Sequence, residues 1–331
     1  MTRNPCASAE EITMRPSALD AATLEKLVSA AVAAPSMHNT RPWYYRLDPD
    51  TVTVEVRADA ERVPRRADPG GRALSISAGA AVFNLRVAMA HFGWRPVVRL
   101  TPRPSEPDLL ATLRPDGGDP GHLDALYEVL WRRQNSHFPF AGERLPHRVR
   151  AELTEAAHAD GAALCFARPE EISQLLRITE EAERRNARDH DLSGPQGDGR
   201  ARDLERRPTV AVLTTRHDRR TDWLRAGQAL QHVLLVATAL TARATLLHQA
   251  LEWPDLRWAL SDNRRAPDHV QMLIRLGYGR SAPDAVTGPA AVTAPDAALS
   301  PAAAERSTPG AYRRPAAPPA PGHRHAFRHA R

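Results

Sequence analysis

The stretch Ala33-Ala34-Pro35-Ser36-Met37-His38-Asn39-Thr40-Arg41-Pro42-Trp43 decides how the rest of the chain is interpreted. Apolar residues between Leu24 and Ala31 recur at helical spacing after Asp20, so the pattern predicts an amphipathic helix capped by Asp20 that runs into this stretch. Each proline disfavours helix at the residue before it. A strand is predicted to follow, from Trp43 to Leu47. The loop between the prolines is therefore short and held at both ends.

Polar side chains crowd this loop. Ser36 and Thr40 supply hydroxyls, His38 an imidazole and Asn39 an amide. A rigid turn with several hydrogen-bonding groups suits a flat ring with polar edges, such as a flavin. The residues alone favour a helix-to-strand corner whose side chains cap the backbone, since such corners are common.

The loop resembles the P-S-x-x-N-x-Q-P-W signature of nitroreductase-like flavoproteins, with Arg41 where that family usually has Gln. With His38 before Asn39 it is similar to the Acg-type branch, in which two such domains are fused in one chain. The resemblance covers roughly residues 15 to 280. It implies a cofactor-binding loop made of Pro35, Ser36, His38, Asn39 and Arg41, with His38 and Asn39 at the edge of the ring.

Size and charge limit the class of protein. A chain of 331 residues suits two domains. Its formal net charge is +6, and no run pairs Arg with exposed aromatic residues on a recognition element, so nucleic acid is not an expected partner. Two distant cysteines indicate a reducing compartment. The polar N-terminus has no apolar signal region, and the most apolar predicted helix, around Val233 to Ala242, is too short to cross a bilayer. We expect a cytoplasmic, soluble protein with no membrane partner.

The remaining pattern predicts alternating helices and strands. Strands are expected at 51–57, 96–100, 161–166, 209–214 and 271–278, and helices at 74–92, 122–134, after Pro146, at 170–188 and at about 223–248. A link rich in Pro, Asp and Gly is expected from Thr101 to Gly121. The Ala- and Pro-rich residues 281–331 are expected to form a disordered tail.

Two similar segments indicate an internal repeat. Ala78-Gly79-Ala80-Ala81-Val82 corresponds to Ala226-Gly227-Gln228-Ala229-Leu230, and each opens a buried helix that leads to a strand. Together with the resemblance, the repeat predicts an α+β, nitroreductase-like fold of two similar domains that form an intramolecular pseudo-dimer. We expect the first domain at 1–118 with the ring loop, and the second at 119–280 with the phosphate side and a short lid at 189–207. The chain should then act as a monomer.

A second motif lies at Arg132-Arg133-Gln134-Asn135-Ser136. It resembles the R-R-S-x-R motif that carries the FMN phosphate in nitroreductases, although Gln134 and Ser136 depart from it. The planar Arg fork suits phosphate oxygens. The resemblance implies a phosphate held by Arg133 and Ser136 beside Arg132, with help from Arg275 or Arg280. From the residues alone, a basic helix C-terminus favoured by the helix dipole remains open.

A third segment, Leu247-His248-Gln249-Ala250-Leu251-Glu252-Trp253-Pro254, is similar to the family segment whose backbone passes the flavin ring near N5. The resemblance implies cofactor-binding positions at Gln249, Leu251 and Glu252. The alternative is a helix C-terminus broken by Pro254.

The order of these segments predicts a single site. The ring loop occurs only in the first half of the chain, and the phosphate-like and N5-like segments occur only in the second. In a nitroreductase dimer each flavin takes these parts from different subunits. Two domains with complementary parts would build one site, so we predict one FMN per chain.

Arg72 and the tail histidines are further candidates. Arg72, which follows Asp68-Pro69, matches a recurring feature of the Acg-type branch and is a candidate flavin contact, although the residues alone favour a structural Asp–Arg pair. His323, His325 and His329 lack a Cys or acidic partner nearby, so a solvated stretch is favoured and no metal is expected. No catalytic side chain is assigned, because a flavin carries the redox chemistry itself.

The resemblance implies an FMN-dependent oxidoreductase that passes electrons from NAD(P)H to a nitroaromatic, a quinone or a similar small-molecule acceptor. The alternative is a protein that binds and sequesters FMN with little or no turnover. The 189–207 segment is short for a lid of that branch and lacks its acidic, Trp-containing stretch, which favours turnover. A cofactor-free interaction protein is a third possibility.

Overall fold

The computed structural model describes residues 20–37, 40–59, 61–62, 68–133, 140–141, 144–188, 209–262 and 268–279. All of them belong to one compact unit, residues 1–290. The expected lid at 189–207 and the tail at 281–331 lie outside the described residues.

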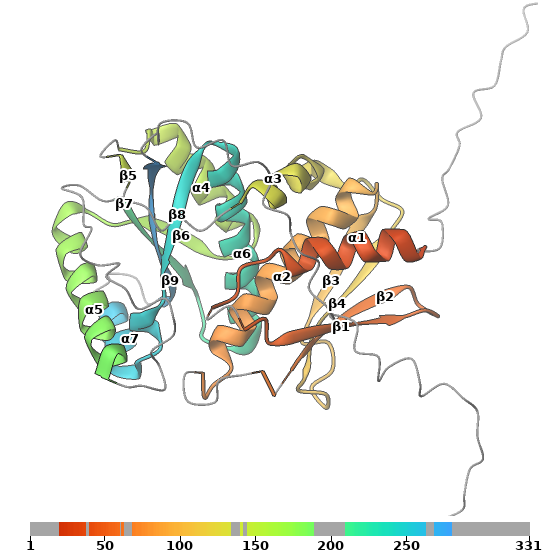
Figure 1. Cartoon of the computed structure of the whole chain (residues 1–331), viewed down its shortest axis with the longest axis horizontal. Coiled ribbons are helices and arrows are strands. Elements are labelled where there is room, and N and C mark those ends of the chain that lie inside the picture. Colours follow the sequence, from red (N-terminus) through yellow and green to blue (C-terminus); the bar gives the residue numbers. More distant parts are fainter. Residues whose placement is uncertain are drawn as a thin grey trace, which may run out of the picture. The chain divides into compact units, whose positions relative to one another are not determined.

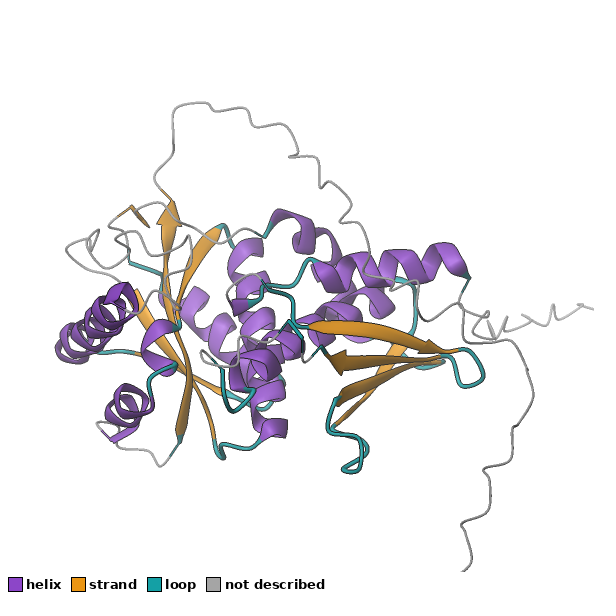
Figure 2. Cartoon of the chain, turned by 60° about the horizontal axis from the view of Figure 1, so that its bottom comes forward, coloured by secondary structure: helices purple, strands orange, loops and turns teal. Residues whose placement is uncertain are grey.

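Two antiparallel sheets organise the described chain (Figures 1 and 2). The first has the strand order β1-β2-β4-β3 and is built from β1 (Trp43–Asp48), β2 (Thr53–Ala58), β3 (Arg95–Leu100) and β4 (Leu109–Asp116). Its helices are α1 (Ala21–Val32) and α2 (Arg72–His91). Asp20 caps α1 as predicted, because its carboxylate accepts a hydrogen bond from the Thr23 backbone amide at 2.7 Å.

The second sheet has the order β5-β9-β7-β6, with β8 also paired to β9. Its strands are β5 (Phe140–Ala141), β6 (Ala163–Phe166), β7 (Thr209–Thr215), β8 (Ala242–Leu247) and β9 (His269–Gly279). The helices of this half are η2 (Gly121–Leu126), α3 (Tyr127–Arg132), α4 (His147–Ala159), α5 (Pro169–Arg188), α6 (Arg220–Ala239), η3 (Gln249–Leu251) and α7 (Pro254–Asp262).

The long helices α2 and α6 cross at the two repeated glycines. A Cβ atom at Gly79 would lie 2.2 Å from the Leu224 carbonyl oxygen, and one at Gly227 would lie 2.0 Å from the Ile76 carbonyl oxygen. Each glycine thus meets the backbone three residues before the other, so the contact is reciprocal. Only glycine allows backbones to approach this closely. The predicted repeat therefore places its two glycines against each other.

The fold has two hydrophobic cores, one against each sheet, and each core contains side chains from both halves of the chain. Met37, Ala73 and Ile76, from the first half, pack in the core under the second sheet. Leu224 and Leu235, from α6, pack in the core under the first sheet. Each half therefore completes the core of the other, as expected for two domains that form a pseudo-dimer.

Helix α2 is enclosed by this packing. Among the described helices, it is the one long and apolar enough to cross a membrane, but 94% of that apolar window is buried inside the fold. Its hydrophobicity is used in the contacts with α6 and with the two cores.

The structure confirms the α+β class and most predicted elements, and it corrects three. The expected link at 101–121 contains β4, which pairs with both β2 and β3. The helix expected to reach residue 248 ends at Ala239, because the chain turns at Thr241, where φ is +60°, and continues as β8. The helix expected at 122–134 begins as the 3₁₀ helix η2, and α3 ends at Arg132.

Candidate functional site

The loop after α1 is hydrogen-bonded to α2 and is buried at Met37. The Met37 backbone amide donates to Ser77 Oγ on α2 at 3.1 Å, and the Met37 side chain is 8% exposed. Ser36 Oγ accepts from the Arg41 backbone amide at 3.3 Å. Arg41, directly before Pro42, adopts a φ of +44°, a strained conformation for a residue with a side chain. His38 and Asn39 lie outside the described residues.

Arg133 of the second half lies against this loop. Its Nη2 donates to the carbonyl oxygen of Ala33 at 3.3 Å, two residues before Pro35. Burial lowers the pKa of Arg133 to about 10, because the charged guanidinium is partly removed from water. The structure therefore brings the ring loop and the main phosphate candidate together. Arg132 is exposed beside it, and Ser136 lies outside the described residues.

Arg275 is a buried cation among the phosphate candidates. It stands on β9, is 6% exposed and places its guanidinium carbon 4.9 Å from the centre of the Phe140 ring. Such a cation–π contact holds the planar group in place. Arg280, the alternative candidate, lies outside the described residues.

The N5-like segment forms η3 and its flanks, at the end of β8. His248 Nδ1 lies 2.7 Å from Glu252 Oε1, and Leu251 is 4% exposed. Trp253 Nε1 donates to Asn186 Oδ1 on α5 at 2.8 Å. Pro254 opens α7 instead of breaking the long helix, so the alternative based on a broken C-terminus does not apply.

Gln249 supplies a buried polar atom to this segment. Within the described part of the chain, its Oε1 has no hydrogen-bond partner. A buried amide oxygen without a partner is costly and marks a place where a further polar group would be accepted. By their chemistry, the guanidinium groups of Arg133 and Arg275 suit a phosphate ester, and this amide oxygen suits a donor on a polar ring.

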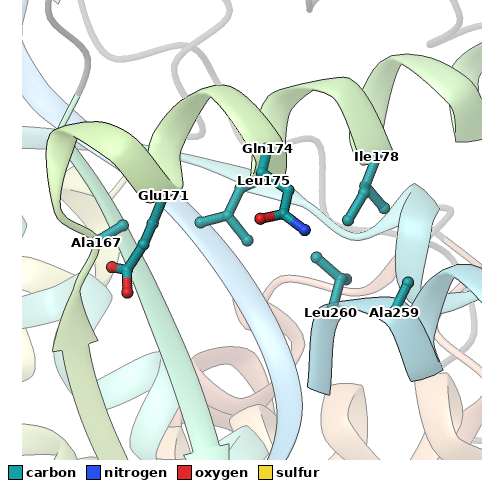
Figure 3. Close-up of a pocket in the computed structure, with 7 residues that line it drawn as sticks. All are labelled: Ala167, Glu171, Gln174, Leu175, Ile178, Ala259 and Leu260. Atoms are coloured by element: carbon teal, nitrogen blue, oxygen red, sulfur yellow. The ribbon is translucent and has the colours of Figure 1, made fainter. Parts of the chain in front are cut away.

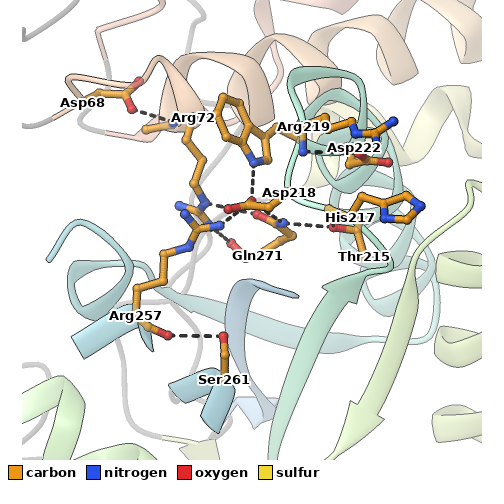
Figure 4. Close-up of polar contacts among 12 residues, drawn as sticks. Asp68, Arg72, Thr215, His217, Asp218, Arg219, Asp222, Arg257, Ser261 and Gln271 are labelled. Atoms are coloured by element: carbon orange, nitrogen blue, oxygen red, sulfur yellow. Dashed lines mark hydrogen bonds and ion pairs between the residues drawn. The ribbon is translucent and has the colours of Figure 1, made fainter. Parts of the chain in front are cut away.

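Arg72 binds Gln271, a partner that neither sequence-based expectation named, and its contact with a flavin stays a prediction. Asp68 caps α2, since its carboxylate accepts from the backbone amides of Ala73 and Leu74 at 3.0 and 2.8 Å. The Arg72 guanidinium instead crosses to β9, where Nε donates to Gln271 Oε1 at 3.1 Å and Nη2 donates to the Gln271 carbonyl oxygen (Figure 4). Burial, followed by the positive charge of Arg257, lowers the pKa of Arg72 to about 9.

Two of these interacting residues, Ser77 and Gln271, are absent from the sequence-based candidates. Gln271 stands in a strand that is buried along nearly its whole length. Ser77 lies in a helix in which almost every residue is buried. A buried polar side chain in such an apolar element needs a hydrogen-bond partner. Their position in apolar stretches of sequence is therefore the feature that marks Ser77 and Gln271 as candidates.

A small pocket between α5 and α7 lies outside the predicted site (Figure 3). Its volume is about 30 Å³, and it is lined by Ala167, Glu171, Gln174, Leu175, Ile178, Ala259 and Leu260. A space of this size holds a few water molecules at most, so the pocket does not fit a flavin. Among the described residues, no group of three His, Cys, Asp or Glu side chains is placed to hold a metal ion.

Comparison with known proteins agrees with the sequence motifs. The chain is 29% identical over 302 residues to "Putative NAD(P)H nitroreductase Rv3131" of Mycobacterium tuberculosis, which covers 78% of this chain and 86% of that protein. It is 29% identical over 298 residues to "Putative NAD(P)H nitroreductase acg" of the same organism, covering 77% of this chain and 88% of that one. No family model matches the chain.

The solved structure of a putative nitroreductase from Anabaena variabilis shares the fold. The two superpose with a TM-score of 0.51 at 12% identity, over 78% of this chain and 88% of that one. Two solved nitroreductases with bound FMN match about half of the chain, with TM-scores of 0.37 and 0.38. The chain is therefore similar in sequence to these putative nitroreductases over more than three-quarters of its length, and it has the α+β nitroreductase-like fold.

Proposed function

We propose that this protein binds one FMN between its two halves and passes electrons from NAD(P)H to a nitroaromatic, a quinone or a similar acceptor. The observation that carries the proposal is the hydrogen bond from Arg133 to the Ala33 carbonyl oxygen. The motifs assign the ring loop and the phosphate group to different halves of the chain, at 1–118 and 119–280. Their contact supplies the meeting point that such a site requires.

The residues fit an FMN. Arg133, a partly buried cation with a lowered pKa, would be stabilised in its charged form by the dianionic phosphate. Arg275 is a second buried cation. The Ser36–Arg41 and Met37–Ser77 hydrogen bonds fix the loop backbone that would lie beside the ring. These contacts preorganise the loop, which lowers the entropy cost of binding a rigid ligand.

FMN would supply the redox chemistry when bound, since it accepts a hydride and releases electrons to an acceptor. The chain's own residues would orient it. Arg133 would hold the phosphate, and the loop with His38 and Asn39 would contact the ring edge. The η3 segment would cover the opposite side with Gln249, Leu251 and Glu252.

A specific observation supports the alternative, FMN sequestration. Leu251 and Arg275 are less than 10% exposed, and Arg133 is itself partly buried. A ligand held by these groups would be shielded from solvent, and shielding also suits storage.

Rapid mixing distinguishes the two functions. The FMN-loaded protein is mixed anaerobically with NADPH or with NADH, and the flavin absorbance near its visible maximum is followed. Bleaching within seconds with either nucleotide supports the reductase. Absorbance that persists with both supports sequestration. Purified protein that is colourless and takes up no added FMN contradicts both and supports the cofactor-free interaction protein.

A further inference from the structure

Helix α2 contacts both sides of the proposed site through two side chains five residues apart. Ser77 accepts the hydrogen bond from the Met37 amide of the ring loop. Arg72, in the first turn, reaches into the second half and binds Gln271 on β9. Five helical residues span about 7.5 Å along the axis, so one rigid element holds both contacts at a fixed spacing.

Gln271 links Arg72 to two further polar side chains, Thr215 and Asp218. It is fully buried, and its Nε2 donates to Thr215 Oγ1 at 2.9 Å and to Asp218 Oδ1 at 3.1 Å. Because its side-chain oxygen accepts from Arg72 and its nitrogen donates to two acceptors, the amide has one orientation that satisfies all of them. Arg72 therefore fixes which way Gln271 presents its donor.

Asp218 connects this amide to α7. Its Oδ1 accepts from Arg257 Nη2 and from Trp223 Nε1 as well as from Gln271, and Figure 4 shows the Arg72 and Arg257 guanidinium groups meeting around it. Arg257 lies on α7, which begins two residues after Glu252. The negative charge of Glu252 is also close enough to favour the charged form of Arg72. The network therefore runs from α2 to the helix that follows the N5-like segment.

We propose that Arg72 is a positioning residue that aligns the N5-like segment, Leu247 to Pro254, with the ring loop. Through Gln271, Asp218 and Arg257 it holds α7 and η3 in register with α2, while Ser77 on the same helix holds the loop. The inference rests on the proposed function, because it assigns the flavin to the gap between these two segments. It assigns Arg72 a role through protein contacts, in place of a direct contact with the flavin.

The test compares two arginines on one helix. Arg72→Met removes the proposed alignment. Arg86→Met is the matched control, because Arg86 also leaves α2 to bind the second half, at Asp160 and Gln228, but belongs to no part of the proposed site. Both variants should lose thermal stability. Arg72→Met should weaken FMN binding about tenfold or more and alter the visible circular dichroism of bound FMN, whereas Arg86→Met should leave both unchanged. Arg72→Lys, which keeps one donor, should recover part of the affinity.

A double-mutant cycle separates positioning from direct contact. If Arg72 acts through Gln271, then Gln271→Leu should weaken FMN binding on its own, and adding it to Arg72→Met should cost little more. Additive losses would show that Arg72 acts independently of Gln271, as a direct contact with the flavin would require. If Arg72→Met does not fold, Arg257→Met interrupts the same network from α7 and should weaken FMN binding about tenfold; unchanged binding in Arg257→Met would then overturn the inference.

Three results overturn the inference: unchanged FMN binding in Arg72→Met, equal losses in Arg72→Met and Arg86→Met, or additivity in the cycle. Failure of the wild-type protein to bind FMN would instead refute the proposed function.

Discussion

Arg133 Nη2 donates a hydrogen bond to the carbonyl oxygen of Ala33, a residue one hundred positions earlier in the chain. The contact joins the end of α3 to the end of α1. It connects the two motifs that the sequence analysis assigned to one cofactor but to different halves.

Arg133→Ala should weaken FMN binding by about 1.5–3 kcal/mol, the scale of a hydrogen bond to a charged group. Quenching of FMN fluorescence on titration with protein gives the dissociation constant. The control is Arg148→Ala, since the Arg148 side chain is 90% exposed and lies outside the site. An unchanged dissociation constant in Arg133→Ala would remove Arg133 from the phosphate site.

Flavin released by acid from saturated, gel-filtered protein should approach one FMN per chain, because the ring loop and the phosphate-like motif each occur once. The released flavin is quantified by absorbance against the protein concentration. A ratio near two would mean that each half builds a site of its own.

Gly79→Ala and Gly227→Ala should each destabilise the fold by about 1–3 kcal/mol or more, because the added methyl group meets backbone atoms that cannot rotate away. Urea unfolding followed by circular dichroism measures the loss. Gly70→Ala is the control, since a Cβ there meets nothing within 4 Å. The double variant should cost less than the sum of the two single changes, because the same gap is opened by either. Stability equal to that of Gly70→Ala would show that the helices are farther apart.

Asp160 should make the fold sensitive to acid. Its carboxylate binds Arg86 and lies 2.8 Å from His232 Nδ1, and although burial opposes the effect, these partners hold its pKa below 3.8. A carboxyl whose pKa is lower in the folded state stabilises the fold above about pH 3.8, and this contribution is lost as the pH falls through the folded value.

Asp160→Asn should therefore cost about 1.5–3 kcal/mol at pH 7, and its difference from the wild type should shrink below pH 3.8. Urea midpoints measured from neutral to acidic pH test this. Asp116→Asn, which changes a more exposed carboxyl bound to Arg95, is the comparison. A constant difference between Asp160→Asn and wild type across the series would contradict the assignment.

The sequence predicted elements whose pattern is strong and local. Helix α1 was located from its spacing and from Asp20, and α2 from its continuous apolar run. β4 was missed because flanking Pro, Asp and Gly residues dominate its region, although Leu109 to Leu113 are nearly all buried. β8 was read as helix because Ala and Leu favour helix, and its pairing with β9 overrides that propensity.

In the candidate site too, local motifs could be predicted from the sequence and long-range contacts could not. The ring loop and Arg133 were identified by motif, and the structure brings them together. The partner of Arg72 was not predictable, because Gln271 lies 199 residues away and reaches it only through the folded sheet. The cofactor roles of all the candidate residues stay predictions: Pro35, Ser36, His38, Asn39, Arg41, Arg72, Arg132, Arg133, Ser136, Gln249, Leu251, Glu252, Arg275 and Arg280.

The crossing at Gly79 and Gly227 also determines what happens when the chain is cut. Eighteen of the twenty residues of α2 are buried, and Leu224 and Leu235 complete the core around it. A fragment that ended near residue 118 would present this helix to water as an aggregation-prone surface. We therefore expect that neither this fragment nor the one that begins after it is recovered in soluble form when expressed alone. Co-expression of the two fragments should reconstitute a non-covalent heterodimer.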